Sequence, residues 1–216
     1  MVTGRARNEN SGAAHDRLYR RLRSQIMHGE IAPGTAMTLR GIGEAFGVSM
    51  TPAREAVRRL AAEGALSISA SGRVATAEPS PERLEELAAL RALLEPELAA
   101  RALPRAHFAL IDRMQAINGQ IAQSAAAHDP VAYIRGNLEF HRSLYLRAQA
   151  PAMLAILENV WVQLGPTMRR LYARSLRSEP PAHHRLILAA LRAGDEPGLR
   201  LAVRTDVTQG LRMLST

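Results

Sequence analysis

The sequence predicts a mainly α-helical fold, in which three helices and a small β-hairpin precede an all-α bundle of about six helices. Apolar residues recur with helical spacing through most of the 216 residues, which indicates amphipathic helices. Strand-like segments are confined to residues 65–76, where they flank a Ser-Gly pair. A Pro-rich stretch at residues 78–81 lies between the two parts and is typical of a linker.

The N-terminal part begins with residues 1–14, which are small, polar and without pattern, so we expect a disordered arm there. From His15 onward the apolar residues share one helix face, formed by Leu18, Leu22 and Ile26. Gly29 ends this helix. Residues 32–35 contain Pro followed by Gly, which predicts a type II turn.

Two further helices are expected before the hairpin of residues 65–76. The first covers residues 39–46 and ends at Gly47. Thr51 suits the N-cap of the second, and Pro52 suits its first helical position. The buried face of this second helix is predicted to hold Ala53, Ala56, Val57, Leu60 and Ala61.

The second part, residues 79–216, is predicted to be entirely helical. Ser80 and Asp129 are each followed by Pro and therefore predict N-caps. The expected helices run roughly over residues 81–102, 105–127, 130–148, 151–175, 181–193 and 196–214.

Composition narrows the class of protein. The chain is 47% apolar, as in globular proteins, and it contains no Cys, which excludes a disulfide scaffold, a thiolate metal site and a cysteine nucleophile. No apolar run is long enough to span a membrane, and the first residues lack the apolar core of a signal peptide, so we expect a cytoplasmic protein. The net charge of +8 favours a polyanionic partner, of which nucleic acid is the commonest.

The order of elements in residues 15–78 is typical of a winged helix-turn-helix domain. The last helix of that motif places residues near its N-terminus against base edges in the major groove, and its free N–H groups attract phosphate. Here Thr51, Arg54 and Arg58 lie on one outward side of that helix, while Gly72 and Arg73 at the hairpin tip suit a close approach to the minor groove. The alternative is an ordinary helical hairpin whose Arg side chains are only solvated.

Three runs in this part resemble the GntR family of bacterial transcription regulators. They are G-x-x-x-P-G at residues 29–34, G-V-S-x-T-P-x-R-E-A at residues 47–56 and R-L-x-x-E-G at residues 59–64. The resemblance implies binding to double-stranded operator DNA, with contacts from Arg40, Ser49, Thr51, Arg54 and the wing tip at Ser71 to Arg73. The family usually has Arg after the Ser, whereas Met50 stands here and cannot donate a hydrogen bond. We therefore expect an altered or relaxed base preference at that contact.

Polar residues stand on the apolar stripes of the predicted bundle, where buried polar groups need partners. Asn137 and His141 lie one turn apart on one helix, and His184 and Asp206 lie on two later stripes. Two imidazoles, a carboxylate and an amide oxygen in one cavity are a credible divalent-metal site. The alternative is that each group is satisfied separately by a neighbour or by water. His183 also competes with His184 for the inward position.

The second part resembles the FCD effector domain of the FadR-like branch of the same family. The similar runs are residues 90–103, 137–145 and 184–195. The resemblance implies an all-α bundle that binds small ligands, usually carboxylates. In many members a divalent metal is held by Asp-x-x-x-His on one helix and by two later His.

Two of the four matching positions differ in type from the family pattern. Asn137 stands where Asp is commoner, and Asp206 stands where the last His is commoner, whereas His141 and His184 agree. The set keeps two imidazoles and one carboxylate, so metal binding is still expected, and zinc, nickel and manganese all suit it.

Arg91 matches an Arg that often faces the effector in such domains. Its guanidinium would hold a carboxylate through two parallel hydrogen bonds. The alternative for Arg91 is an intrahelical pair with Glu95, four residues later.

The sequence therefore predicts a ligand-responsive transcription regulator, expected to be a repressor released by a small carboxylate effector. A homodimer would read an inverted repeat in its operator. One alternative is a DNA-binding dimer with no effector, and another is a metal-dependent helical enzyme. The sequence offers no nucleophile motif and no evident general base beside the metal-binding residues, so we expect no enzyme.

Overall fold

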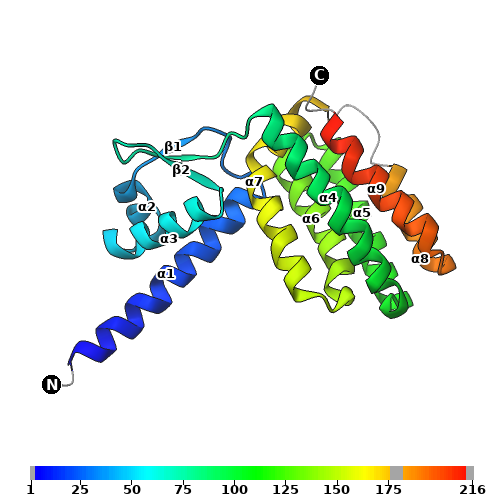
Figure 1. The fold of residues 1–216 in the computed structure, drawn as a ribbon, viewed down its shortest axis with the longest axis horizontal. Coiled ribbons are helices and arrows are strands. Elements are labelled where there is room, and N and C mark those ends of the chain that lie inside the picture. The colour runs from blue at the N-terminus through cyan, green and yellow to red at the C-terminus, as the bar shows by residue number, and fades with distance from the viewer. Residues whose placement is uncertain (1–2, 176–181, 213–216) are drawn as a thin grey trace.

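The computed structural model describes the backbone of residues 3–175 and 182–212 and the side chains of residues 15–173 and 182–209. Within these ranges an N-terminal unit of three helices and a small sheet lies beside a C-terminal unit of six α-helices (Figure 1). The predicted fold class is confirmed for both units. No helix in the described part of the chain is both long and apolar enough to cross a membrane.

The N-terminal unit is built around an antiparallel sheet of three short strands in the order β1-β3-β2. Leu66 pairs with Thr76 and Ile68 with Val74 in the predicted hairpin. The apolar faces predicted for the first and third helices are buried together against the sheet. In chain order the elements are α1 (Thr3–Met27), β1 (Ala36–Met37), α2 (Leu39–Phe46), α3 (Met50–Ala62), β2 (Leu66–Ile68) and β3 (Val74–Thr76).

The helix α1 is longer than the sequence predicts. A disordered arm is expected over residues 1–14, whereas the backbone is helical from Thr3, and residues 1 and 2 lie outside the described part. Residues 3–14 contain no Pro, and extending an existing helix costs little compared with nucleating one. The regular helix that starts at His15 can therefore continue backward through a polar stretch.

The helix α3 begins two residues before its predicted first position. Ser49 is its N-cap residue, so the predicted cap at Thr51 is wrong and Pro52 is the third residue of the helix. The first four N–H groups of a helix have no partner within it, so Pro is tolerated at that position as well.

The turn between α1 and α2 has the predicted geometry and also carries an unpredicted strand. Thr35 N donates to Ala32 O at 3.3 Å, and Gly34 has a φ of +69°, which is favourable for glycine. The next two residues form β1, in which Ala36 pairs with Ala75 of the hairpin. A strand of two residues has too little alternation to be detected in the sequence.

The C-terminal unit is helical as predicted. Ser80 caps α4 by accepting from Arg83 N, and Asp129 caps α6 by accepting from Val131 N and Ala132 N. Positions 181 and 213–214, which the predicted helices include, lie outside the described residues. The elements are α4 (Pro81–Ala102), η1 (Leu103–Arg105), α5 (Phe108–Ala126), α6 (Pro130–Tyr145), η2 (Leu146–Ala148), α7 (Pro151–Ser175), α8 (Ala182–Ala193) and α9 (Glu196–Arg212).

The two units meet where the end of α1 packs on α7. Val162 of α7 is buried in the apolar core of the N-terminal unit. A Cβ on Gly165 would lie 2.2 Å from the backbone oxygen of Ile26, so only glycine allows this close approach. Arg169 donates to the backbone oxygen of Glu30 at 2.7 Å. The C-terminal end of α1 is thus held against the bundle.

Candidate functional site

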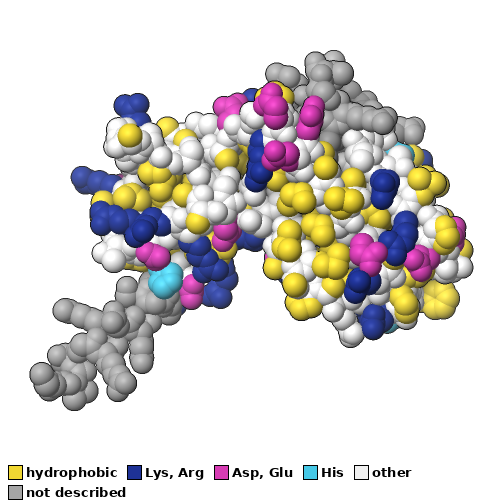
Figure 2. Space-filling view, viewed as in Figure 1, with side chains coloured by type: hydrophobic (Ala, Val, Ile, Leu, Met, Phe, Trp, Pro, Cys, Tyr) yellow, Lys and Arg dark blue, Asp and Glu magenta, His cyan; other side chains and the backbone are white. Residues whose placement is uncertain are grey.

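The residues predicted to contact DNA are all exposed on the N-terminal unit. They lie on α2, at the beginning of α3 and at the tip of the β2–β3 hairpin. Figure 2 shows Arg side chains, in dark blue, gathered over this end of the molecule. The contacts with DNA themselves remain predictions. The exposed residues are Arg40, Ser49, Met50, Thr51, Arg54, Arg58, Gly72 and Arg73.

The N-terminus of α3 is open to a ligand. Ser49 occupies the N-cap position, but its side chain makes no capping hydrogen bond. Its hydroxyl and the first N–H groups of the helix therefore suit a phosphate oxygen. The side chain of the next residue, Met50, is 46% exposed, so an apolar group stands at the position where the family usually has Arg.

The local geometry of three further predicted contacts, Arg40, Gly72 and Arg73, is as follows. Arg40 lies on α2, where its Nε donates to Glu44 at 2.9 Å. Gly72 has a φ of +79° at the hairpin tip, and a Cβ there would meet open space, so the backbone conformation explains the glycine. Arg73 is anchored through its backbone N–H, which donates to Ser69 Oγ at 3.1 Å, and its side chain is exposed.

Three predicted metal ligands come together inside the bundle. His141 of α6, His184 of α8 and Asp206 of α9 each place one potential ligand atom within 4.8 Å of the others. His141 Nε2 lies 3.0 Å from Asp206 Oδ2, and His184 Nε2 lies 3.9 Å from Asp206 Oδ1. Both imidazoles are buried, and the Asp206 side chain is 11% exposed. His184, not His183, takes the inward position.

The hydrogen bonds behind His141 determine which ring nitrogen carries its proton. The Glu95 carboxylate can only accept, so the Tyr145 hydroxyl donates to Glu95 Oε2 at 2.9 Å. That hydroxyl then accepts from His141 Nδ1 at 3.1 Å. Without a metal, His141 Nε2 donates to Asp206 Oδ2 at 3.0 Å when the ring is protonated. A bound cation would replace that proton and take the Nε2 lone pair, while Nδ1 keeps its bond to Tyr145.

The orientation of His184 is also determined by its neighbours, which differ from those of His141. Its Nδ1 donates to Asn118 Oδ1 at 2.9 Å, and its ring stacks on Phe140 with centroids 4.0 Å apart. Burial lowers the pKa of His184 to about 4, so the imidazole is neutral at pH 7. Among the described side chains, the Nε2 atoms of His141 and His184 are both buried without a hydrogen-bond partner.

The Asp206 carboxylate completes the donor set. Burial raises its pKa, but interaction with His141, and then with His184 and Arg91, outweighs burial and holds the pKa at about 2. Two orphaned imidazole nitrogens and an ionised carboxylate therefore face one space. This donor set fits a divalent cation such as zinc, nickel or manganese.

Asn137, the fourth predicted ligand, lies one turn before His141 on α6. It lines a small crevice of about 20 Å³ together with Arg91, Trp161 and Met27. This crevice is large enough for about one water molecule. A direct role of Asn137 in holding a metal remains a prediction.

Arg91 forms the intrahelical pair that the sequence offers as the alternative to effector contact. Its Nε donates to Glu95 Oε1 at 2.5 Å, and both side chains are buried. Burial lowers the pKa of Arg91, but the charge and hydrogen bond of Glu95 outweigh it and raise that pKa. Because Arg91 also lines the crevice, the two interpretations of this residue are compatible.

Tyr145 and Asn118 belong to this site although their part in it is not among the sequence-based predictions. Glu95 is predicted only as the partner of Arg91, but it is fully buried and also accepts from Trp161 Nε1 at 3.2 Å. Tyr145 follows His141 by four residues, and that spacing alone could have indicated a pair on one helix face. The role of Asn118 depends on packing between α5 and α8 and leaves no local signal.

Comparisons with known proteins agree with both halves of this description. Residues 86–209 match the model of the FCD domain, and residues 14–74 match the model of bacterial regulatory proteins of the gntR family. The chain is 28% identical to the HTH-type transcriptional regulator McbR of Escherichia coli (strain K12) over 196 residues, and this aligned region covers 89% of each protein.

Solved structures show the same architecture. The structure of E. coli McbR superposes with a TM-score of 0.84 at 26% identity, covering 94% of this chain and 97% of that one. A GntR transcriptional regulator from Rhodococcus sp. RHA1 superposes with a TM-score of 0.76 at 19% identity, covering 94% of this chain and 99% of that one. The second likeness concerns the fold alone.

Proposed function

The chain belongs to the GntR family of bacterial regulatory proteins and carries the FCD domain, and on this basis we propose that it is a repressor released from its operator by a small carboxylate effector. As a member of this family, it is a DNA-binding, ligand-responsive transcription regulator. In the proposed function it works in the cytoplasm as a homodimer and has no catalytic role.

In the proposed DNA complex, the two α3 helices of a dimer enter major grooves at the two halves of an inverted repeat. Arg54 and Arg58 project from the exposed side of α3, and Arg is the usual reader of guanine. Ser49 and Arg40 face the phosphate backbone in this arrangement. The hairpin tip, with its exposed Arg73, reaches the adjacent minor groove.

In the proposed effector site, His141, His184 and Asp206 hold a divalent cation, with Asn137 as the fourth protein ligand. A bound cation supplies open coordination positions that suit a carboxylate oxygen. Arg91 lines the crevice that Asn137 also lines, and its Nε is already bonded to Glu95. We therefore assign its terminal amino groups, rather than its Nε, to the effector.

The observation that carries the proposed release is the position of Met27, the last residue of α1. Met27 belongs to the DNA-binding unit, yet it forms one wall of the crevice that Arg91 and Asn137 line. A carboxylate effector larger than one water does not fit into about 20 Å³ unless a wall moves. Displacement of Met27 would shift α1 and with it the DNA-binding unit. The effector would then favour one arrangement of the two units and the operator another, so that binding of one weakens binding of the other.

The test is a titration of operator DNA selected by the protein from a random pool. Fluorescence anisotropy would follow binding of the metal-loaded protein in the presence of small carboxylates. We expect at least one acid to weaken operator binding tenfold or more, which corresponds to about 1.4 kcal/mol of coupling. We expect His141→Ala to bind the operator without responding to that acid, and elemental analysis should show that this variant has lost its divalent metal.

Two results would contradict the proposal. Operator binding that no acid changes, in a protein that holds its metal, would indicate a DNA-binding dimer without an effector. A response that persists in His141→Ala would place the effector elsewhere in the molecule.

A further inference from the structure

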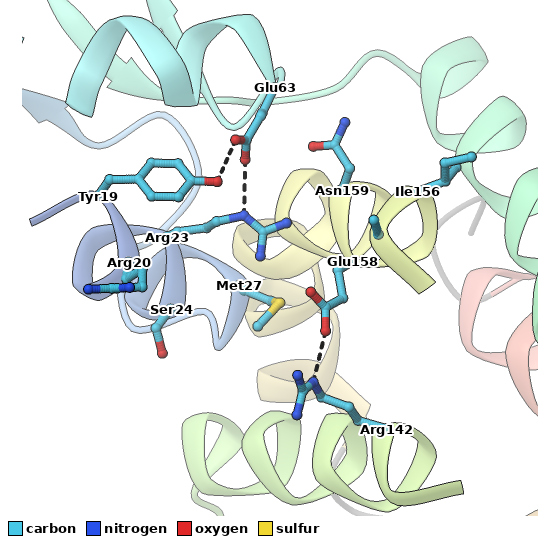
Figure 3. A pocket seen from close by; sticks show the side chains of 11 residues that line it. Tyr19, Arg20, Arg23, Ser24, Met27, Glu63, Arg142, Ile156, Glu158 and Asn159 are labelled. Carbon is cyan, nitrogen blue, oxygen red and sulfur yellow. Dashed lines mark hydrogen bonds and ion pairs between the residues drawn. The ribbon is translucent and has the colours of Figure 1, made fainter. Parts of the chain in front are cut away.

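A second and larger cavity lies between the two units, away from the metal ligands. It has a volume of about 660 Å³, and its walls come from α1 and the end of α3 on one side and from α6 and α7 on the other (Figure 3). Cavities that bind small molecules typically measure about 300–1,000 Å³ and often lie at domain interfaces. None of the candidate metal ligands lines this cavity.

Three arginines line the cavity: Arg20 and Arg23 of α1, of which Arg20 is exposed, and Arg142 of α6. Arg23 of α1 donates through Nε to Glu63 Oε2 at 3.0 Å, and Arg142 of α6 donates through Nε to Glu158 Oε1 at 2.8 Å. Among the described side chains, these are the only side-chain hydrogen bonds of Arg23 and Arg142, so their terminal amino groups are left for a ligand. Planar guanidinium groups suit carboxylate, sulfonate and phosphate.

The remaining lining is mixed: Tyr19, Met27, Ala155 and Ile156 supply apolar surface, and Arg20, Ser24 and Asn159 are polar. Met27 lies between Arg23 and Arg142 in Figure 3, and Ile156 of α7 is 54% exposed at the edge of the cavity. Asn159 Oδ1 is buried without a hydrogen-bond partner among the described residues.

We propose that this cavity is a second ligand site, which binds a small amphipathic anion between the two units. The anionic group binds the free terminal amino groups of Arg23 and Arg142, and the apolar body packs on Met27 and Ile156. The site is separate from the metal-dependent effector site proposed above.

A ligand in this cavity would change the contacts that hold the C-terminal end of α3 against α1. Glu63 is the C-cap residue of α3, and it accepts hydrogen bonds from both Arg23 and the Tyr19 hydroxyl of α1. An anion that binds Arg23 competes with Glu63 for it. The ligand would therefore change the contact that fixes the end of α3 against α1.

The test uses the full-length protein and the fluorescent anion anilinonaphthalene sulfonate, which combines an aromatic body, a sulfonate and an N–H donor. We expect saturable binding of one probe per chain, which persists after the metal is removed with a chelator. Arg23→Gln and Arg142→Gln should each weaken binding roughly tenfold or more, since a hydrogen bond to a charged group is lost. Arg147→Gln is the matched control, because this exposed Arg of the bundle lies outside the cavity, and its affinity should be unchanged.

Three outcomes would overturn the proposal. The first is the absence of saturable binding in the folded protein, including the case in which a second copy of the chain covers the cavity. The second is equal affinity of the wild-type protein and Arg142→Gln, which retains the native fold by circular dichroism. The third is an equal loss in Arg147→Gln, which would indicate a general effect of surface charge.

Discussion

Each of the two units contains an Arg–Glu ion pair with the same helical spacing, exposed to solvent in the N-terminal unit and buried in the C-terminal unit. On α2, Arg40 and Glu44 lie four residues apart and 2.9 Å from each other, with side chains 83% and 66% exposed. On α4, Arg91 and Glu95 have the same spacing and lie 2.5 Å apart, with side chains 7% and 0% exposed. Water competes with the first pair and is excluded from the second. Removing one partner therefore leaves an uncompensated buried charge only in the second pair.

The same contrast separates the two functional regions. The predicted DNA contacts are exposed residues that form no connected network with one another. The candidate metal ligands are members of one largely buried network, in which Tyr145 donates to Glu95 and accepts from His141. We therefore expect substitutions in the first region to change affinity for DNA without changing stability, and substitutions in the second to lower stability as well as change the ligand site.

The largest effect is expected from Glu95→Ala, which leaves the Arg91 guanidinium buried without its counter-ion. Breaking a buried pair in this way costs about 3–5 kcal/mol of unfolding free energy. The exposed counterpart, Glu44→Ala, should cost no more than about 0.5 kcal/mol. Urea denaturation of both variants measures the difference.

The double variant Arg91→Met with Glu95→Leu separates burial from charge. Replacing both members by apolar side chains should recover much of the stability that Glu95→Ala loses. If Glu95→Ala and Glu44→Ala unfold with equal free energies, the buried Arg91–Glu95 pair does not stabilise the bundle more than the exposed pair stabilises its own unit.

The next largest effect is expected from Arg54→Ala on operator binding. Each contact between Arg and a base is worth about 1–3 kcal/mol, and a dimer loses two, so specific affinity should fall at least about 30-fold. The unfolding midpoint should be unchanged, because the side chain is exposed. Arg105→Ala, an exposed Arg of the bundle, is the control in the same anisotropy titration. Unchanged operator affinity in Arg54→Ala would contradict the assignment of α3 as the recognition helix.

The sequence predicted those parts of the molecule that depend on local signals. The helix caps at Ser80 and Asp129 and the type II turn before Thr35 follow from the chemistry of three or four neighbouring residues. The inward positions of His141 and His184 follow from the spacing of apolar residues on each helix.

The parts that the sequence could not predict depend on packing between elements. Two residues cannot signal a strand, so β1 becomes visible only through its pairing with β3. The bond from His184 to Asn118 joins α8 to α5, and the bonds that converge on Glu95 join α4 to α6 and α7. Spacing within one helix contains no information about these partners.

A smaller effect is expected from Tyr145→Phe, which removes the hydroxyl between Glu95 and His141. The loss of a group that orients a metal ligand typically weakens metal binding about 10–100-fold. Tyr133→Phe on the same helix is a matched control, since the Tyr133 hydroxyl makes no hydrogen bond to His141, His184 or Asp206 in the described part of the chain. Titration with zinc against a competing chelator measures both variants. Equal zinc affinities for Tyr145→Phe and Tyr133→Phe would show that the hydroxyl does not position His141.

The smallest effect is expected from Met50→Arg, which restores the residue that the family usually has at the start of α3. The side chain is 46% exposed, so the substitution should leave the unfolding free energy nearly unchanged. The new guanidinium can donate to guanine, and one such contact is worth about 1 kcal/mol at the low end, so each half-site should show at least about fivefold preference for guanine at one base position. Selection from a random DNA pool, carried out side by side with the wild-type protein, reveals that preference. If both proteins select the same sequences, residue 50 does not face a base, and the contact region of α3 begins after it. If only the variant prefers guanine at that position, single residues of the exposed region can be changed independently, whereas the buried side chains of the bundle depend on one another.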